Sequence, residues 1–323
     1  MISKPTFVSL GHPSGIGPEV FIKAINDQKL RQHLSKIILV SSSKVIEGAI
    51  SAIGVKQKIN LISDIKQAQP DSINLINVDG CKDFVLGEPT LNNSEFIVEC
   101  LSKAADLALT NSSCLVTGPL NKSIIQKHVQ NFTGHTEFLK RKFNTNEVLM
   151  YMTNGNLHLG ILTTHIPLKD VPNAISRDLI KNKYKLLHHG LVDIFKLASP
   201  KIAVLGINPH AGEFGTIGNE EQNTILPAID ELRDEGHDAY GPISADTVFT
   251  QTKYDAVLSM YHDQALPVLK TIDFNKTVNI TLGLPFLRVS VDHGTAEDIA
   301  KSYSANYESM MEALLISIAR NEA

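Results

Sequence analysis

Short apolar runs alternate with longer amphipathic stretches along most of this chain, and this alternation constrains the fold more than any other feature. Strand patterns lie at residues 6–10, 36–41, 73–78, 113–117, 201–206, 256–260 and 278–282. Helical patterns lie at residues 43–53, 92–110, 137–143, 176–197, 220–235 and 307–320, and one more helix is expected from Pro18. Strands that alternate with helices favour an α/β sheet covered on both faces.

The middle of the chain departs from this pattern. Residues 147–153 and 157–164 both have strand patterns, and they flank the turn sequence Asn154-Gly155-Asn156. An Asn-Gly turn between two strand patterns is a strong signal for an antiparallel hairpin. The chain has 323 residues, more than the roughly 100–200 of a usual single domain. Two α/β domains with a hairpin insertion are therefore expected.

Composition excludes several classes of protein. The 30 basic and 34 acidic residues give a formal charge of −4, so nucleic acid and anionic membranes are not expected partners. No apolar run approaches the ~20 residues that span a bilayer, and the first residues lack the apolar core of a signal peptide. Three scattered cysteines without a CxxC pair argue against a disulfide framework or a cysteine zinc site, so a cytoplasmic protein is expected.

Three histidines directly follow predicted strands. They are His165 after GILTT, His210 after KIAVLGINP, and His262 after AVLSMY. Loops after strands carry the active sites of α/β sheets, and three imidazoles with one open position are a pattern of catalytic zinc. The separations of 45 and 52 residues form no local metal motif. From the residues alone, a metal site and three separate structural histidines both remain open.

Two glycine turns are candidates for ligand binding. Gly15 and Gly17 allow tight backbone geometry ahead of the helix from Pro18, whose N-terminus attracts anions. The loop is not GxGxxG, so a Rossmann site is not predicted. In the second turn, Gly294 precedes Thr295, which is expected to cap a helix. A purely structural turn explains each of them as well.

Polar residues stand in unusual places at three further positions. His135 and Thr136 precede the helix expected at 137–143, where they either cap that helix or grip a phosphate. Asn279 and Arg288 lie in apolar strand surroundings, and Lys270 follows the sequence HDQALPVL. Such residues often aim into a cleft, because buried polar groups need partners. A solvent-facing side of each element is the alternative.

Together these segments closely resemble the 4-hydroxythreonine-4-phosphate dehydrogenase family over nearly the whole chain. The most specific motifs are GIGPE at 15–19, VTGPLNK at 116–122, FTGHTEFL at 132–139, NPHAGE at 208–213, MYHDQ at 260–264, LPVLK at 266–270 and the run at 278–296. The resemblance implies the isocitrate and isopropylmalate dehydrogenase-like fold. That fold has two α/β/α domains with the active-site cleft between them, and its homodimer completes each site with both chains. The expected cofactor-side domain spans 1–125 and 275–323, and the metal, substrate and dimerisation domain spans 126–274.

The resemblance also implies roles for single residues. The implied metal ligands are His165, His210 and His262; the substrate residues are His135, Thr136, Lys270, Asn279 and Arg288; and the cofactor residues are Gly15, Gly17, His293, Gly294 and Thr295. Asp246, in SADTVF, is a candidate catalytic residue, and the general base stays unassigned. His12, Phe214 and Ala265 stand where the family usually has Asp, Gly and Gly. The last two are expected to narrow the pocket.

The implied reaction is NAD- or NADP-dependent oxidation of 4-phosphooxy-L-threonine to 2-amino-3-oxo-4-phosphooxybutanoate. That product then decarboxylates to 3-amino-2-oxopropyl phosphate, in pyridoxine biosynthesis. One divalent ion per subunit, Zn²⁺, Mg²⁺ or Co²⁺, would acidify the substrate hydroxyl. Three alternatives stay open: a 4-phosphothreonate or 4-phosphoerythronate dehydrogenase of the same family, a metal-dependent phosphate-ester hydrolase, and a non-catalytic phosphate-binding protein.

Overall fold

The chain folds into two compact units. The computed structural model describes residues 4–130 and 132–322. One unit comprises residues 1–145 and 284–323, and the other comprises Asn146–Gly283. The boundaries expected at 125 and 274 therefore move to 145 and 283. The reasons are packing of Phe143 against Phe286 in the first unit and pairing of β11 (Val278–Leu282) with β6 (Leu149–Thr153) in the second.

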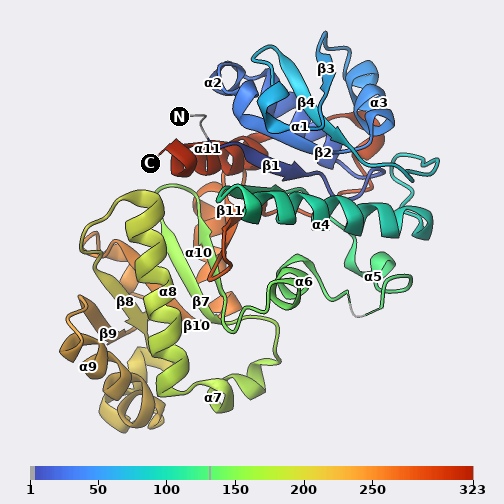
Figure 1. Ribbon diagram of the computed structural model, residues 1–323. Coiled ribbons are helices and arrows are strands. Elements are labelled where there is room, and N and C mark those ends of the chain that lie inside the picture. Colours follow the sequence, from blue (N-terminus) through green and yellow to red (C-terminus); the bar gives the residue numbers. More distant parts are fainter. Residues whose placement is uncertain (1–3, 131, 323) are drawn as a thin grey trace. The chain divides into compact units, whose positions relative to one another are not determined.

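The first unit is built on a parallel sheet with strand order β3-β4-β2-β1-β5-β12 (Figure 1). The strands are β1 (Thr6–Ser9), β2 (Ile37–Ser41), β3 (Lys58–Leu61), β4 (Ser72–Asn77), β5 (Cys114–Thr117) and β12 (Leu287–Val291). The helices are α1 (Gly17–Asn26), α2 (Gln28–Arg31), α3 (Ser43–Ile53), α4 (Ser94–Thr110), α5 (Lys122–Ile125), α6 (His135–Lys142) and α11 (Glu308–Glu322). Helix α4 packs on β1, β2 and β5, while α11, together with α1, covers the other face. Burial on both faces explains the continuous apolar runs of the central strands.

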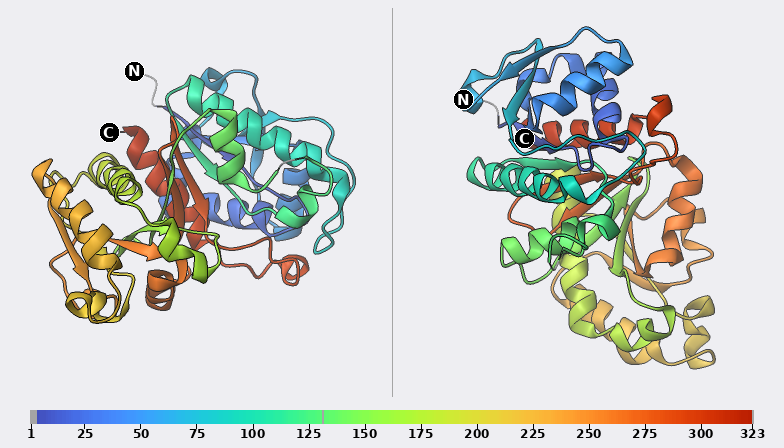
Figure 2. Two further views of the ribbon diagram at one scale, coloured as in Figure 1. Left: turned by 90° about the horizontal axis from the view of Figure 1, so that it is seen from below. Right: turned by 90° about the vertical axis from the view of Figure 1, so that its right-hand side faces the viewer.

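The second unit has the strand order β11-β6-β7-β10-β8-β9. Its further elements are β7 (His158–Thr163), β8 (Ile202–Leu205), β9 (Ala239–Ile243), β10 (Ala256–Tyr261), α7 (Val171–Ala174), α8 (Arg177–Phe195), α9 (Leu226–Asp234) and α10 (His262–Asp273). The predicted hairpin is confirmed, because β6 and β7 pair antiparallel. It is the middle of the sheet rather than an appendage, since β7 also pairs with β10. Helices α8 and α9 lie on one face and α10 on the other (Figure 2).

Helix α10 covers the core of the second unit. Ala265, Leu266 and Leu269 pack against apolar side chains of the central strands, among them Met152 and Leu159. Ala265 is completely buried there. The expectation that Ala265 narrows a ligand pocket is therefore wrong, because its methyl group faces the core.

The sequence patterns placed every expected strand within two residues. Helices α1, α3, α4, α6, α8 and α11 also lie within two residues of their expected bounds, whereas α9 begins at Leu226, after a π-helical turn at Glu221–Ile225. Three strands and four helices had no prediction: β3, β9 and β12, and α2, α5, α7 and α10. The helix expected from Thr295 is absent, because Ala296 has a left-handed φ of 44°, which a right-handed helix cannot contain. Among the described residues, no helix combines the length and apolarity that crossing a membrane requires.

Candidate active site

The three predicted metal histidines all lie in the second unit, beside the carboxyl ends of adjacent strands. Strands β7, β10 and β8 are parallel neighbours, so their carboxyl ends share one edge of the sheet. His165 follows β7, His262 follows β10 at once, and His210 follows β8 by five residues. We call these three residues the histidine edge.

His165 and His262 are close neighbours, with ring centroids 6.0 Å apart. Two imidazoles bound to one zinc ion would have centroids about 5–6 Å apart, given Zn–N distances of about 2.0–2.1 Å. This pair therefore fits a shared divalent ion. His210 stands apart from it, with its Nδ1 3.9 Å from Asp246 Oδ2. In residues 4–130 and 132–322, no three His, Cys, Asp or Glu side chains gather closely enough to hold a metal ion.

Helix α10 positions His262 and connects two strands of the histidine edge. Gln264, in its first turn, accepts from the N–H of Met260 at 2.7 Å and donates to the carbonyl of Gly206 at 2.6 Å. The ends of β10 and β8 are thereby tied together. No helix was predicted here, because Tyr261 at the N-cap makes no side-chain capping bond and Pro267 lies inside the helix.

His210 lies on a left-handed turn of unusual length. His210, Ala211, Glu213 and Phe214 have φ values between 44° and 56°, and Gly212 between them has 77°. For non-glycine residues this conformation costs roughly 1–2 kcal/mol each, and such strain clusters at functional sites. Phe214 is 95% exposed, so within this chain it narrows no pocket, contrary to expectation.

Asp246 is an exposed neighbour of His210. Its Oδ1 accepts from Ser244 Oγ at 2.5 Å, and this bond is the main reason that the pKa of Asp246 lies below its ordinary value. A lowered pKa makes the carboxylate a weak proton acceptor near neutrality. Asp246 is therefore a poor candidate for the general base.

In the first unit, Arg288 is a buried cation held by two hydroxyls. It is 3% exposed, and its Nε and Nη2 donate to Thr117 Oγ1 at 3.1 and 2.8 Å. Its Nη1 donates to Thr136 Oγ1 at 3.3 Å. Burial lowers the pKa of Arg288 to about 10, so the guanidinium remains charged at neutral pH. The nearby carboxylate of Glu137 opposes this lowering of the pKa. A buried guanidinium is a strong partner for an anionic ligand.

The start of α6 adds further donors near Arg288. The helix begins at His135 after Gly134, which has no side-chain cap, so His135 and Thr136 lie in the first turn and are not the expected caps. The first-turn N–H groups of a helix favour anions. Burial, Arg288 and Lys122 lower the pKa of His135 well below its ordinary value, so His135 is neutral.

Lys122 and Thr117 complete what we call the Arg288 cluster, which comprises Thr117, Lys122, His135, Thr136 and Arg288. A Cβ atom added at Gly134 would lie 3.4 Å from Lys122 Nζ, so this ammonium reaches the start of α6. Sequence reasoning missed both residues as site residues. Their signal was the motif VTGPLNK at 116–122, which contains them both.

The other two predicted substrate residues belong to the second unit. Lys270 lies on α10, with its ammonium 5.6 Å from the ring centroid of Phe274. Asn279 lies on β11 opposite Met152 of β6. The first unit therefore brings His135, Thr136 and Arg288 together, and Lys270 and Asn279 belong to the second unit.

The predicted cofactor loops meet in the first unit. The N–H of Ile16 donates to the carbonyl of Thr295 at 3.0 Å, and a Cβ added at Gly15 would lie 2.8 Å from that same oxygen. A Cβ at Gly17 would lie 2.2 Å from the carbonyl of Leu10. These close approaches require glycine at both positions. His293 and Gly294 directly precede Thr295, and His293 Nδ1 donates to the carbonyl of Gly294 at 3.0 Å.

Buried polar atoms around these loops fit a polar cofactor. Among the described residues, His12 Nε2, Glu19 Oε2 and His293 Nε2 are buried and have no hydrogen-bond partner in the chain. Glu19 and Gly15 line a cavity of about 110 Å³, together with apolar side chains such as Phe84 and Leu86. Buried polar groups require partners, and a bound polar ligand would supply them.

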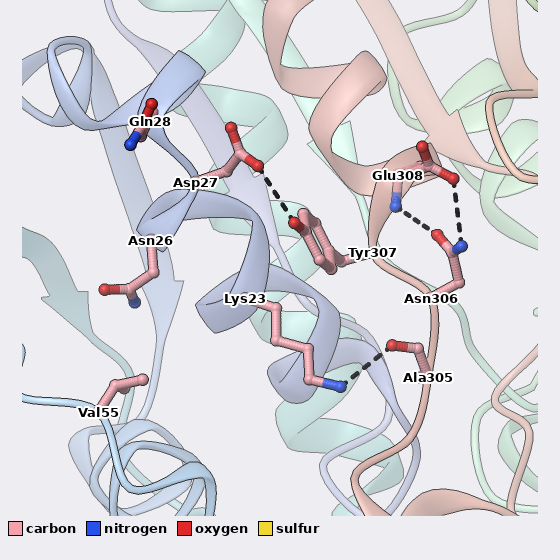
Figure 3. Close-up of a pocket in the computed structure, with 9 residues that line it drawn as sticks. All are labelled: Lys23, Asn26, Asp27, Gln28, Val55, Ala305, Asn306, Tyr307 and Glu308. Atoms are coloured by element: carbon pink, nitrogen blue, oxygen red, sulfur yellow. Dashed lines mark hydrogen bonds between the residues drawn. The ribbon is translucent and has the colours of Figure 1, made fainter.

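A larger hollow of about 710 Å³ lies elsewhere on the first unit, between α1 and the start of α11 (Figure 3). Its polar groups already pair with one another. Lys23 Nζ donates to the Ala305 carbonyl at 3.1 Å, and Tyr307 donates to Asp27 at 3.1 Å. None of the predicted site residues lines this hollow, so it is not the candidate site.

Relatives of this chain settle its family. The sequence model of the family described as "Pyridoxal phosphate biosynthetic protein PdxA" matches residues 33–317. The chain belongs to the PdxA family. A crystal structure of 4-hydroxythreonine-4-phosphate dehydrogenase from Klebsiella pneumoniae is 32% identical, with a TM-score of 0.90 over 99% of both chains. The enzyme of that name from Burkholderia phymatum is 31% identical, with a TM-score of 0.85 over 98% of both chains.

These relatives make this member of the PdxA family a dehydrogenase and confirm the expected α/β fold. A β-decarboxylating dehydrogenase from Thermococcus kodakarensis shares the fold at 12% identity, with a TM-score of 0.50 over 97% of this chain and 81% of its own. The fold is thus shared with distant dehydrogenases, and the PdxA assignment rests on the nearer relatives.

Proposed function

We propose that this PdxA-family dehydrogenase oxidises 4-phosphooxy-L-threonine with NAD or NADP. The product, 2-amino-3-oxo-4-phosphooxybutanoate, then loses carbon dioxide to give 3-amino-2-oxopropyl phosphate, a step in pyridoxal phosphate biosynthesis. The observation that carries this proposal is the full-length similarity to the Klebsiella pneumoniae 4-hydroxythreonine-4-phosphate dehydrogenase. The Arg288 cluster, with its buried guanidinium, supports the phosphorylated substrate.

The protein's own groups would bind and orient the substrate. Arg288 and Lys122 supply positive charge for the phosphate, and the first turn of α6 supplies N–H donors. Neutral His135 can donate a hydrogen bond without adding charge. Lys270 and Asn279 would contact the substrate from the second unit. Holding the phosphate away from the reacting carbon aligns that carbon for reaction.

Two bound groups would complete the chemistry. We propose one divalent ion, Zn²⁺, Mg²⁺ or Co²⁺, at His165, His210 and His262, and a nicotinamide cofactor at Gly15, Gly17, His293, Gly294 and Thr295. When bound, they supply Lewis acidity at the substrate hydroxyl and a hydride acceptor. The paired imidazoles of His165 and His262 support the ion, and the unpartnered polar atoms beside Glu19 support the cofactor.

We further propose a homodimer in which both chains complete each site. The support is that only two of the three histidines are neighbours within one chain. Mixing His165→Ala with His210→Ala protein, each inactive alone, should restore part of the activity once subunits exchange. No recovery after verified exchange would show that each metal site is built within one chain.

The function is tested by assaying the purified protein for nicotinamide reduction with phosphothreonine and with phosphothreonate, each with and without a chelator. Reduction with phosphothreonine that the chelator abolishes is the expected result. A preference for phosphothreonate would instead identify the enzyme as a 4-phosphothreonate dehydrogenase of the same family. Phosphate release without nicotinamide reduction would identify a hydrolase and overturn the proposal.

A further inference from the structure

The turn that carries His210 closes around one buried carboxylate, that of Glu221. Glu221 is 2% exposed, and it opens a π-helical turn, Glu221–Ile225, ahead of α9. Single π-helical turns occur frequently at functional sites. Because the Glu221 side chain is turned toward the His210 turn and away from solvent, its role follows from its contacts with that turn.

The carboxylate holds the entrance to the turn. Its Oε1 accepts from the N–H groups of Ile207 and Asn208 at 2.8 and 2.7 Å. Its Oε2 accepts from the side-chain amide of Asn208 at 2.9 Å. Hydrogen bonds to an ionised acceptor are stronger than neutral ones. The backbone is therefore anchored two residues before His210.

The same carboxylate fills the inside of the turn. A Cβ atom added at Gly212 would lie 2.5 Å from Glu221 Oε2, and one added at Gly206 would lie 3.1 Å from Oε1. Gly212 also has a φ of 77°, which favours glycine. Both ends of the segment around His210 thus pack directly on Glu221.

We propose that Glu221 is a positioning residue that sets the direction of the His210 imidazole. The role rests on the function proposed above, in which His210 is a metal ligand. His210 itself has a φ of 53°, a conformation that an L-residue keeps only when its surroundings impose it. Without the carboxylate, the turn relaxes toward right-handed geometry and the imidazole swings away. Glu221 acts through the backbone and does not touch the substrate.

The test compares full-length wild type with Glu221→Gln, which keeps the side-chain size but places an NH₂ donor against existing donors. Co²⁺ binding, followed by its absorption spectrum, should weaken about 10- to 100-fold, as for other residues that orient metal ligands. The His210 imidazole resonances of the metal-free protein should also shift, while thermal unfolding stays cooperative. Gly212→Ala should act likewise, and the double variant should add little, because both changes act through one contact.

Asp255→Asn is the matched control. Asp255 Oδ2 accepts from the N–H of Lys201 at 2.7 Å, at the opposite end of β8, so its loss should leave Co²⁺ binding and the His210 resonances unchanged. A folded Glu221→Gln protein with wild-type Co²⁺ affinity and unshifted His210 resonances overturns the positioning role. Wild-type Co²⁺ binding by His210→Ala instead overturns the proposed metal site, and the resonance shift then still decides the role of Glu221.

Discussion

The Arg288 cluster and the histidine edge differ in burial and in how firmly their side chains are held. Arg288 is buried, and the hydroxyls of Thr117 and Thr136 fix its guanidinium. The histidine edge is open to solvent: the side chain of His210 is 65% exposed, and that of His262 is 34% exposed. The first region is organised before any ligand arrives. The second presents good ligands whose arrangement within one chain is incomplete.

The unfavourable free energy has a different source in each region: a buried charge in the Arg288 cluster and a strained backbone in the histidine edge. In the Arg288 cluster, a desolvated guanidinium with the Glu137 carboxylate nearby can form charge-assisted hydrogen bonds to a phosphate that enters. In the histidine edge, the cost lies in the left-handed backbone at 210–214, which buried contacts of Glu221 offset. Substitutions at Arg288 should therefore change how strongly the protein prefers an anionic ligand. Substitutions at the histidine edge should change the geometry of the loop and the affinity for metal.

The largest expected effect is at the histidine edge. His262→Ala removes one imidazole of the pair with His165, and it should lower kcat/KM by about a thousandfold or more, since a Lewis acid contributes several kcal/mol. Steady-state kinetics with a circular dichroism check of folding measure this. His189→Ala, at an exposed histidine of α8, is the control and should stay active. A fully active His262→Ala enzyme would show that activity does not require a metal ion held by His262.

Acid should weaken the unit beneath the histidine edge. Burial lowers the pKa of His158 from 6.5 to about 4, while its ring packs between Tyr151 and Phe195. The folded state therefore keeps His158 neutral, and the stability that this provides is present above about pH 6.5 and lost as pH falls toward about 4. Between about pH 7 and about pH 5 the free energy of unfolding should fall by about 2 kcal/mol from this group. Urea titrations at several pH values measure it.

The control for the pH effect is a pair of glutamine variants. His158→Gln should flatten the pH dependence, whereas His128→Gln, at an exposed position, should keep the wild-type slope. Equal slopes for wild type and His158→Gln would mean that other groups cause the acid sensitivity.

The Arg288 cluster should respond to ligand charge. Charge-assisted hydrogen bonds contribute about 1.5–3 kcal/mol each, so Arg288→Ala should lower kcat/KM about 10- to 150-fold, mostly through KM. Arg288→Lys should recover only part, because an ammonium lacks the planar fork that binds Thr117 and Thr136. On a substrate without phosphate, Arg288→Ala should lose little further activity. Equal losses of activity on both substrates would mean that Arg288 has a structural role or binds the carboxylate end of the substrate.

The smallest expected effect concerns the strained turn. Phe214 is 95% exposed with a φ of 56°, so Phe214→Gly should relieve strain and raise the free energy of unfolding by about 0.5–1 kcal/mol. Thermal melts measure this change. A clear loss of stability would instead indicate that the phenyl ring is covered in the assembled protein, and dilution would then show whether the loss depends on subunit association.

Local sequence patterns alone predicted much of the fold. The β6–β7 hairpin follows from the Asn154-Gly155 turn, and the position of the three candidate metal histidines after strands follows from the apolar runs before them. These features depend on neighbouring residues along the chain, so a periodicity of two or of about 3.6 reveals them. The fold class follows from the same periodicities.

Tertiary structure alone decided the rest. Arg288 meets a hydroxyl 171 residues away in Thr117 and another 152 residues away in Thr136, and no local pattern encodes such pairings. The left-handed turn at His210 packs against the carboxylate of Glu221, which comes from another element. Short-range propensity opposes both arrangements, a buried cation and a positive φ. They persist because burial and hydrogen bonds from distant residues outweigh that propensity, and a single sequence does not display those contacts.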